Sequence, residues 1–152
     1  MSDVFSKQKR SEVMSNIKSS NTKPEKQIRS LLHNLGYKFR LHDKKIPGKP
    51  DLKLSKYNTV ILINGCFWHR HNCHLFKPPK SNVEFWDEKL DKNRDRDLKN
   101  IENLIELDWR VLVIWECAIK GKQSLNDKEL ASKISLFLNS NFHLAEITGN
   151  IG

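Results

Sequence analysis

The sequence predicts an α/β fold in which a mixed central sheet is flanked by helices. Two apolar runs, residues 59–63 and 110–116, have the length and composition of buried strands. A long helical pattern lies between them, so their connection is a crossover. Because crossovers join parallel strands, we expect the two runs to be parallel and to end at one edge of the sheet.

A β-hairpin is predicted to include the first buried strand. Residues 47–50 form a turn, Asp51 opens a short strand over residues 51–54, and residues 55–58 connect it to the next strand. In an antiparallel hairpin turning near residues 56–57, the numbers of paired residues sum to about 113. This register predicts that Asp51 lies beside Leu62 or Ile63.

Two amphipathic helices are predicted near the ends of the chain. The first starts at Thr22, which can form a capping box with Glu25, and stops at Gly36; the last starts at Asn126 with Glu129 as its box partner. Apolar residues at helical spacing mark their core-facing sides: Ile28, Leu31, Leu32 and Leu35, then Leu130, Ile134, Phe137 and Leu138. For Glu25, a purely structural role is the alternative to a chemical one.

The long crossover helix is predicted to run from Ser81, with Glu84 as its capping-box partner, to about Leu107. Its core-facing stripe contains Trp86, Leu90, Asn93, Asp97, Ile101 and Leu104. Asn93 and Asp97 interrupt that stripe, and polar residues on a buried seam need partners or a chemical role. Alternatively, this part of the helix projects beyond the sheet into solvent.

Length and composition set further expectations. A chain of 152 residues is expected to be one domain, with residues 1–20 as an arm or short helix, or a frayed terminus, and residues 139–152 as a loose tail. Without a long apolar run or a signal peptide, we expect a soluble cytoplasmic protein. The net charge of +9 favours nucleic acid over an anionic membrane as partner, although many cytoplasmic proteins are mildly basic.

Residues 66–74 combine cysteines, histidines and aromatic residues directly after the first buried strand. Cys66, His71 and Cys73 can be joined by Cys117, which follows the parallel strand at the same edge of the sheet. Three thiolates and one imidazole form a closed tetrahedral set typical of structural Zn²⁺. The alternatives are three reduced core cysteines, or a neighbouring histidine (His69 or His74) as the nitrogen ligand.

A second polar group is expected at the same edge: Asp51, the Ile63 carbonyl, His69, Asp97 and Glu25. Carboxylates combined with backbone oxygen suit Mg²⁺, a cation that also coordinates phosphate. An imidazole titrates near neutrality and can deprotonate an attacking water. In a basic protein this group predicts a metal-dependent phosphodiesterase that acts on nucleic acid.

Large aromatic side chains, Phe67, Trp68 and Trp86, are expected near this group. Apolar side chains of this size can wedge between base pairs, and a mismatched step costs less to open than a paired one. Ordinary core packing is the alternative for all three residues.

These residues also occur in the order of a known family. The chain resembles the very short patch repair (Vsr) endonucleases, bacterial enzymes that nick T:G mismatches. The resemblance covers about residues 5–120, and its most specific segment is Gly-Cys-Phe-Trp-His-Arg-His-Asn-Cys at residues 65–73. The other matching segments are residues 22–26, residues 47–51, Phe85-Trp86 with Lys89, Lys92-Asn93, Arg96-Asp97, and residues 109–111 and 115–117.

The resemblance implies a restriction-endonuclease-like fold with a structural zinc held by four ligands: Cys66, His71, Cys73 and Cys117. It also implies that Asp51 binds Mg²⁺ beside the Ile63 backbone carbonyl and that Glu25 acts through metal-bound water. His69 would be the general base, paired with Asp97.

For DNA recognition, the resemblance implies an intercalating wedge made of Phe67, Trp68 and Trp86. Lys89 and Asn93 would read the wobble pair, and Met14 and Ile17 would reach the minor groove. Family members cut the thymine strand 5′ to the thymine at deaminated 5-methylcytosine sites, and they work with the mismatch-repair machinery. We expect a monomer that associates with the bacterial nucleoid when it is bound to DNA.

The chain departs from related nucleases at one position of the expected site. Those nucleases have an acidic-x-Lys motif at the end of the second hairpin strand, where this chain has Ile63-Asn64-Gly65. The missing lysine favours His69 as the base and leaves Ile63 only its carbonyl. Two other functions remain as alternatives: a zinc-stabilised DNA-binding module without catalysis, and a double-strand restriction endonuclease on the same fold.

Overall fold

The computed structural model describes residues 22–69, 71, 73 and 75–150. The predictions for Met14, Ile17 and the rest of the N-terminal arm fall outside these residues, as does the alternative ligand His74. No helix in the described part of the chain is long and apolar enough to cross a membrane.

A five-stranded sheet forms the centre of the fold, and its strands lie side by side in chain order. The strands are β1 (Arg40–Leu41), β2 (Leu52–Leu54), β3 (Thr59–Asn64), β4 (Arg110–Trp115) and β5 (Leu144–Ile147). β1, β2 and β3 pair antiparallel, whereas β3, β4 and β5 pair parallel. The predicted mixed sheet is therefore confirmed, including the parallel pairing of β3 with β4.

The β2–β3 hairpin has the register that the sequence predicts. Leu52 pairs with Ile61, and Leu54 pairs with Thr59. The 3-10 turn η1 (Ser55–Tyr57) and Asn58, with a φ of 52°, connect the strands. Asparagine tolerates this left-handed conformation better than most residues, so it suits the tight link. The register places Asp51 next to the end of β3.

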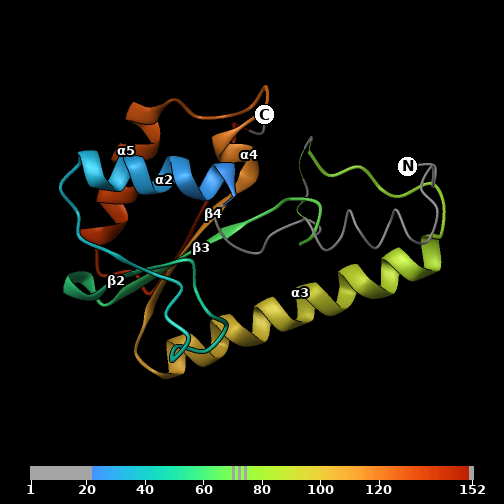
Figure 1. Ribbon diagram of the computed structural model, residues 1–152, viewed down its shortest axis with the longest axis horizontal. Helices are drawn as coiled ribbons and strands as arrows, with labels where there is room; N and C mark the ends of the chain where they lie inside the picture. Colours follow the sequence, from blue (N-terminus) through green and yellow to red (C-terminus); the bar gives the residue numbers. More distant parts are fainter. Residues whose placement is uncertain (1–21, 70, 72, 74, 151–152) are drawn as a thin grey trace.

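Helices cover both faces of the sheet (Figure 1). One face carries α2 (Lys23–Asn34), α4 (Glu116–Ile119) and α5 (Asp127–Leu138), and the other carries the crossover helix α3 (Val83–Glu106). Leu112 and Ile114 of β4 face the first set, while Val111 and Val113 pack with Leu104 of α3, because successive strand residues point to opposite faces. In Figure 1 the N-terminal part of α3 projects beyond the sheet.

The caps of α2 and α5 follow the sequence, whereas the start of α3 does not. Thr22 Oγ1 accepts the Glu25 N–H over 3.4 Å, and Asn126 Oδ1 accepts the Glu129 N–H over 2.8 Å. The predicted cap of α3 at Ser81 is wrong by one residue: Asn82 is the cap, with a φ of 51°. Its left-handed backbone, which asparagine tolerates, turns the chain into the helix.

The end of the chain also differs from the expectation of a loose tail over residues 139–152. Residues 144–147 form β5, which pairs with β4. Arg110 fixes the segment before it by donating to the carbonyls of Leu138, Ser140 and Phe142. β5 lacks an apolar run because it is an edge strand whose side chains are largely exposed, so periodicity could not identify it.

Candidate active site and metal centre

An open cleft of about 1150 Å³ lies at the carboxyl end of β3, and the predicted catalytic residues line it. Its wall includes Asp51, Ile63, His69 and Asp97, together with the first turn of α2. Several cationic side chains also line it: Lys44, Lys49, Lys89, Arg96 and Lys120. Cations around a group of carboxylates suit a site that must attract a polyanion and also hold a metal ion.

Asp51 lies one residue before β2, and its carboxylate oxygen accepts the Ile63 N–H over 2.7 Å. This bond confirms the predicted neighbourhood of Asp51 and Ile63. Burial raises the pKa of Asp51 to about 7, and the Glu25 carboxylate adds to the rise; the Ile63 N–H, His42 and His69 oppose it. Burial destabilises the ionised form of this carboxyl group, and a nearby cation would stabilise it. The electrostatics at Asp51 therefore favour metal binding.

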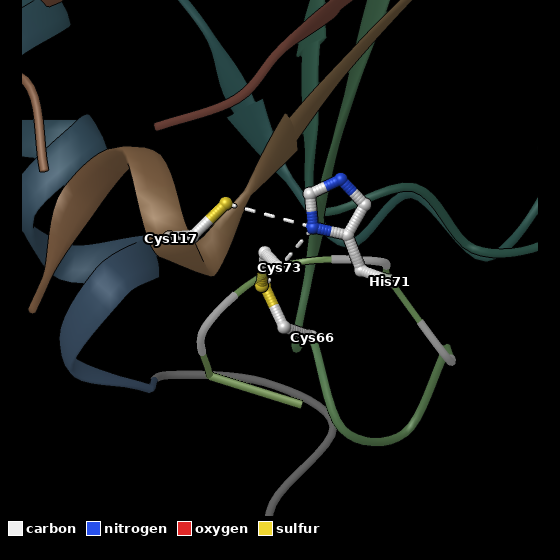
Figure 2. A group of neighbouring side chains, drawn as sticks. All are labelled: Cys66, His71, Cys73 and Cys117. Atoms are coloured by element: carbon white, nitrogen blue, oxygen red, sulfur yellow. Dashed lines mark hydrogen bonds between the residues drawn. The ribbon is translucent and has the colours of Figure 1, made fainter. Parts of the chain in front are cut away.

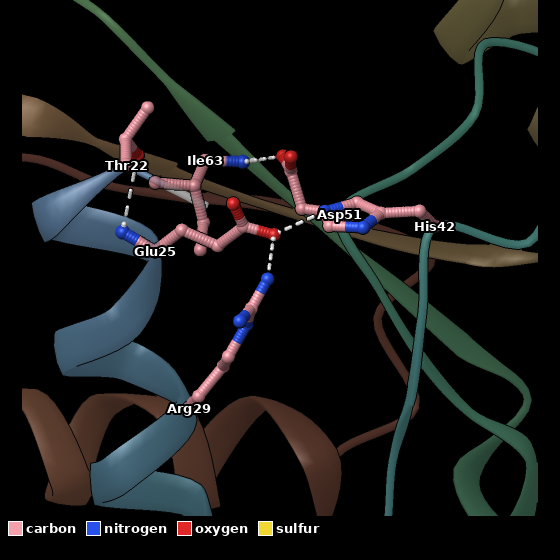
Figure 3. Close-up of polar contacts among 6 residues, drawn as sticks. All are labelled: Thr22, Glu25, Arg29, His42, Asp51 and Ile63. Atoms are coloured by element: carbon pink, nitrogen blue, oxygen red, sulfur yellow. Dashed lines mark hydrogen bonds and ion pairs between the residues drawn. The ribbon is translucent and has the colours of Figure 1, made fainter. Parts of the chain in front are cut away.

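The Glu25 carboxylate, on the first turn of α2, is buried beside Asp51, with an exposed fraction of 1%. It accepts a hydrogen bond from Arg29 over 3.0 Å and contacts the imidazole of His42 (Figure 3). The candidate ligand atoms of Glu25, His42 and Asp51 all lie within 4.8 Å of one another. Glu25 is thus part of the polar group as well as of the helix start.

His69 and Asp97 form a second pair in the same cleft. His69 Nδ1 contacts a carboxylate oxygen of Asp97, which lies on α3. The carboxylate favours the tautomer with the proton on Nδ1, and this leaves Nε2 able to accept a proton. Of the two polar residues that interrupt the α3 stripe, Asp97 therefore has a specific partner, and the cleft explains its place.

The predicted zinc ligands come together at the same edge of the sheet (Figure 2). His71 Nδ1 lies 3.5 Å from the sulfur of Cys66 and 3.5 Å from that of Cys117, and all four ligand atoms, including Cys73 Sγ, lie within 4.8 Å. Tetrahedral Zn²⁺ bonds would separate nitrogen and sulfur by about 3.5 Å. The donor set therefore fits a zinc ion, and the imidazole stacks on Trp115 with centroids 4.0 Å apart.

Burial shapes the protonation of these ligands. It raises the pKa of the Cys66 and Cys117 thiols and lowers the pKa of His71. Without a metal, the sulfurs of Cys66 and Cys117 would stay protonated and the imidazole neutral; a bound cation would stabilise the thiolates. Two hydrogen bonds hold ligands of this cluster in place. The Gly149 N–H donates to Cys117 Sγ over 3.3 Å, and the Cys66 N–H donates to the Glu116 carboxylate over 3.1 Å.

The aromatic residues form one cluster beside the cleft. Phe67 and Trp68 are half-buried and line the cleft, and their centroids are 5.6 and 5.9 Å from that of Trp86. The resemblance implies that Trp86 is part of the wedge, but its side chain is only 6% exposed and packs against the rings of Phe67 and Trp68. Asn93 donates to the Trp68 carbonyl over 3.4 Å, and Lys89 lies one helical turn before Asn93 at the cleft wall.

Sequence reasoning missed His42 and Glu116. His42 lies directly after the two-residue strand β1, which is too short to produce an alternating pattern. The sequence therefore could not show that the His42 side chain points toward the site. Glu116 follows β4 and precedes Cys117, and its position next to a predicted ligand was the available signal. Both residues lie in the cleft lining.

Comparison with known proteins shows the family of this chain. Residues 2–75 match the family described as DNA mismatch endonuclease Vsr. The chain is 46% identical to the DNA mismatch endonuclease Vsr of Escherichia coli (strain K12), with 88% of this chain and 86% of that protein covered. It is 48% identical to the type II nicking enzyme V.NmeAIP of Neisseria meningitidis, with 80% and 87% covered, and 43% identical to the type II nicking enzyme V.XorIIP of Xanthomonas oryzae, with 82% and 92% covered. The chain belongs to the Vsr family of DNA mismatch endonucleases.

Proposed function

We propose that this DNA endonuclease nicks the thymine-containing strand of T:G mismatches, 5′ to the thymine, where 5-methylcytosine has been deaminated. The observation that carries the proposal is that three features lie at one basic cleft. They are Asp51 with its neighbour Glu25, the His69–Asp97 pair, and the aromatic rings of Phe67 and Trp68. The protein would act as a monomer in the bacterial cytoplasm, on nucleoid DNA and with the mismatch-repair machinery.

Asp51 and the Ile63 carbonyl would hold Mg²⁺, with Glu25 contacting its water shell. The acidic group suits this cation, because Mg²⁺ prefers oxygen ligands and keeps several waters. When bound, the ion would polarise the scissile phosphate and stabilise the charge on the attacking and leaving oxygens.

His69 would take the proton from the attacking water through Nε2. Asp97 supports this role because its contact with Nδ1 orients the ring and stabilises the imidazolium that forms. General base catalysis of this kind contributes about 10²–10⁴ in rate.

Mismatch recognition would come from the aromatic cluster and its neighbours on α3. Phe67 and Trp68, braced by Trp86, would enter the base stack, and Lys89 and Asn93 would read the wobble pair from the cleft wall. Met14 and Ile17 would add minor-groove contacts from the N-terminal arm.

The four-ligand cluster Cys66, His71, Cys73 and Cys117 would hold a structural Zn²⁺ that fixes the loop carrying Phe67, Trp68 and His69. The surrounding domain, residues 1–152, would have the restriction-endonuclease-like fold, a proposal that the mixed sheet and its flanking helices support. Metal analysis of purified protein should give one equivalent of zinc, and none would contradict the structural zinc.

Two alternatives are less well supported. A DNA-binding module without catalysis gains nothing from carboxylates that line its phosphate cleft, because they repel the ligand. A restriction endonuclease that cuts both strands usually needs a symmetric dimer, whereas we propose that this protein acts as a monomer.

Cleavage of labelled duplexes with Mg²⁺ tests the proposal. A T:G duplex should be nicked in the thymine strand only, and a fully paired duplex of the same sequence should stay intact. Asp51→Asn should abolish nicking and leave binding largely unchanged, because asparagine can still accept the Ile63 N–H. Equal cutting of both strands in paired DNA would contradict the proposal.

A further inference from the structure

His42 has no part in the proposed mechanism, yet the backbone places it beside the metal site. In β1, Leu41 pairs with Leu52, so the same register carried one step further sets His42 opposite Asp51. The His42 N–H donates to the Asp51 carbonyl over 3.2 Å, which fixes this arrangement. The candidate ligand atoms of His42 and Asp51 lie within 4.8 Å of each other, so the imidazole and the Asp51 carboxylate lie on one side of the sheet.

The conformation of His42 directs its ring into the cleft. Its φ is 46°, a left-handed value that histidine adopts more readily than most residues. The side chain is 27% exposed and lines the cleft, and Nε2 lies 2.5 Å from Glu25 Oε1 (Figure 3). A nitrogen donor, a buried carboxylate and the Asp51 carboxylate thus converge, with ligand atoms within 4.8 Å of one another.

We propose that His42 is a direct ligand of the catalytic cation, so that the site accepts Mg²⁺ but binds Mn²⁺ more tightly. An all-oxygen site suits Mg²⁺, whereas an imidazole donor favours first-row transition cations. The inference rests on the proposed function, because it concerns the cation of that same site. The competing role for His42 is to position Glu25 through the Nε2 contact alone, with no bond to the cation.

Pulsed EPR distinguishes the two roles, because a coordinated imidazole gives a ¹⁴N coupling to bound Mn²⁺. The full-length, zinc-loaded protein is titrated with Mn²⁺ in the absence of DNA, and calorimetry gives the Mn²⁺ and Mg²⁺ affinities. Mn²⁺ is the suitable probe because the thiolate cluster disfavours it. His42→Asn is the main variant, since asparagine keeps the left-handed backbone but offers no ring nitrogen.

The unmodified protein should show the ¹⁴N coupling, and His42→Asn should lose it. The Mn²⁺ affinity should fall about 10- to 100-fold and the Mg²⁺ affinity by less than about threefold. His42→Gly, which allows the same φ without strain, should give the same result if the asparagine variant folds poorly. His33→Asn, at an exposed histidine in the last turn of α2 and outside the cleft, is the matched control and should change neither affinity.

A ¹⁴N coupling that persists in both His42 variants would overturn the proposal. The proposal would also be overturned if the unmodified protein lacked the coupling and the variants lowered the Mn²⁺ and Mg²⁺ affinities equally. His42 would then only position Glu25. Both outcomes are read without DNA, so they are independent of T:G nicking. Failure to nick T:G duplexes would instead count against the proposed function.

Discussion

At the scale of single residues, the protonation of Asp51 should control metal binding. Burial raises its pKa to about 7, and a cation needs the ionised carboxylate. Below pH 7 a proton therefore competes with the metal, and the apparent Mg²⁺ affinity should rise about tenfold per pH unit up to pH 7 and level off above it. Calorimetric titrations between pH 6 and pH 8.5 measure this change, and a flat profile would exclude Asp51 as the controlling group.

The His69–Asp97 pair allows a second prediction at this scale. Asp97→Asn removes the charge that holds the His69 tautomer, so kcat should fall about 10²–10⁴-fold with little change in DNA affinity. Single-turnover nicking and binding titrations measure the two quantities. Asp95→Asn, at an exposed position of the same helix, is the control and should keep kcat unchanged. Parallel losses in both Asp variants would show a general effect on α3 instead.

At the scale of elements, the segment after β5 packs against the proposed zinc ligand Cys117 through one glycine, Gly149. A Cβ added to Gly149 would lie 2.5 Å from the Cys117 carbonyl oxygen and 2.7 Å from that of Gln123, and both are backbone atoms that cannot move aside cheaply. Gly149→Ala should therefore cost about 1–3 kcal/mol in the free energy of unfolding and speed zinc release to a chelator.

Gly65→Ala is the matched control for this prediction. There an added Cβ would meet Trp68 at 3.5 Å, an ordinary contact. Thermal unfolding and a colorimetric zinc-release assay measure both variants. Equal stability of Gly149→Ala and the unmodified protein would show that this close packing is not required.

Which elements could be predicted depends on how much local pattern each one has. The β2–β3 hairpin and its pairing with β4 follow from apolar runs and a crossover, so the sequence placed Asp51 beside Ile63 and Cys117 beside Cys66. β1 and β5 have no such pattern: one has two residues and the other is an exposed edge. Their positions depend on long-range pairing, and His42, which β1 places, was missed for that reason.

At the scale of the whole molecule, the distribution of positive charge should govern DNA affinity. The net charge is +9, and lysines and an arginine line the cleft that holds the catalytic residues. Binding to a T:G duplex should therefore weaken steeply with salt, because each phosphate contact releases counterions. Lys44→Ala, at an exposed lysine of the cleft wall, should reduce the log–log salt slope by about 0.9. Lys128→Ala, at an exposed lysine of α5 outside the cleft, should leave it unchanged, and equal slopes for both variants would show that DNA does not follow this wall.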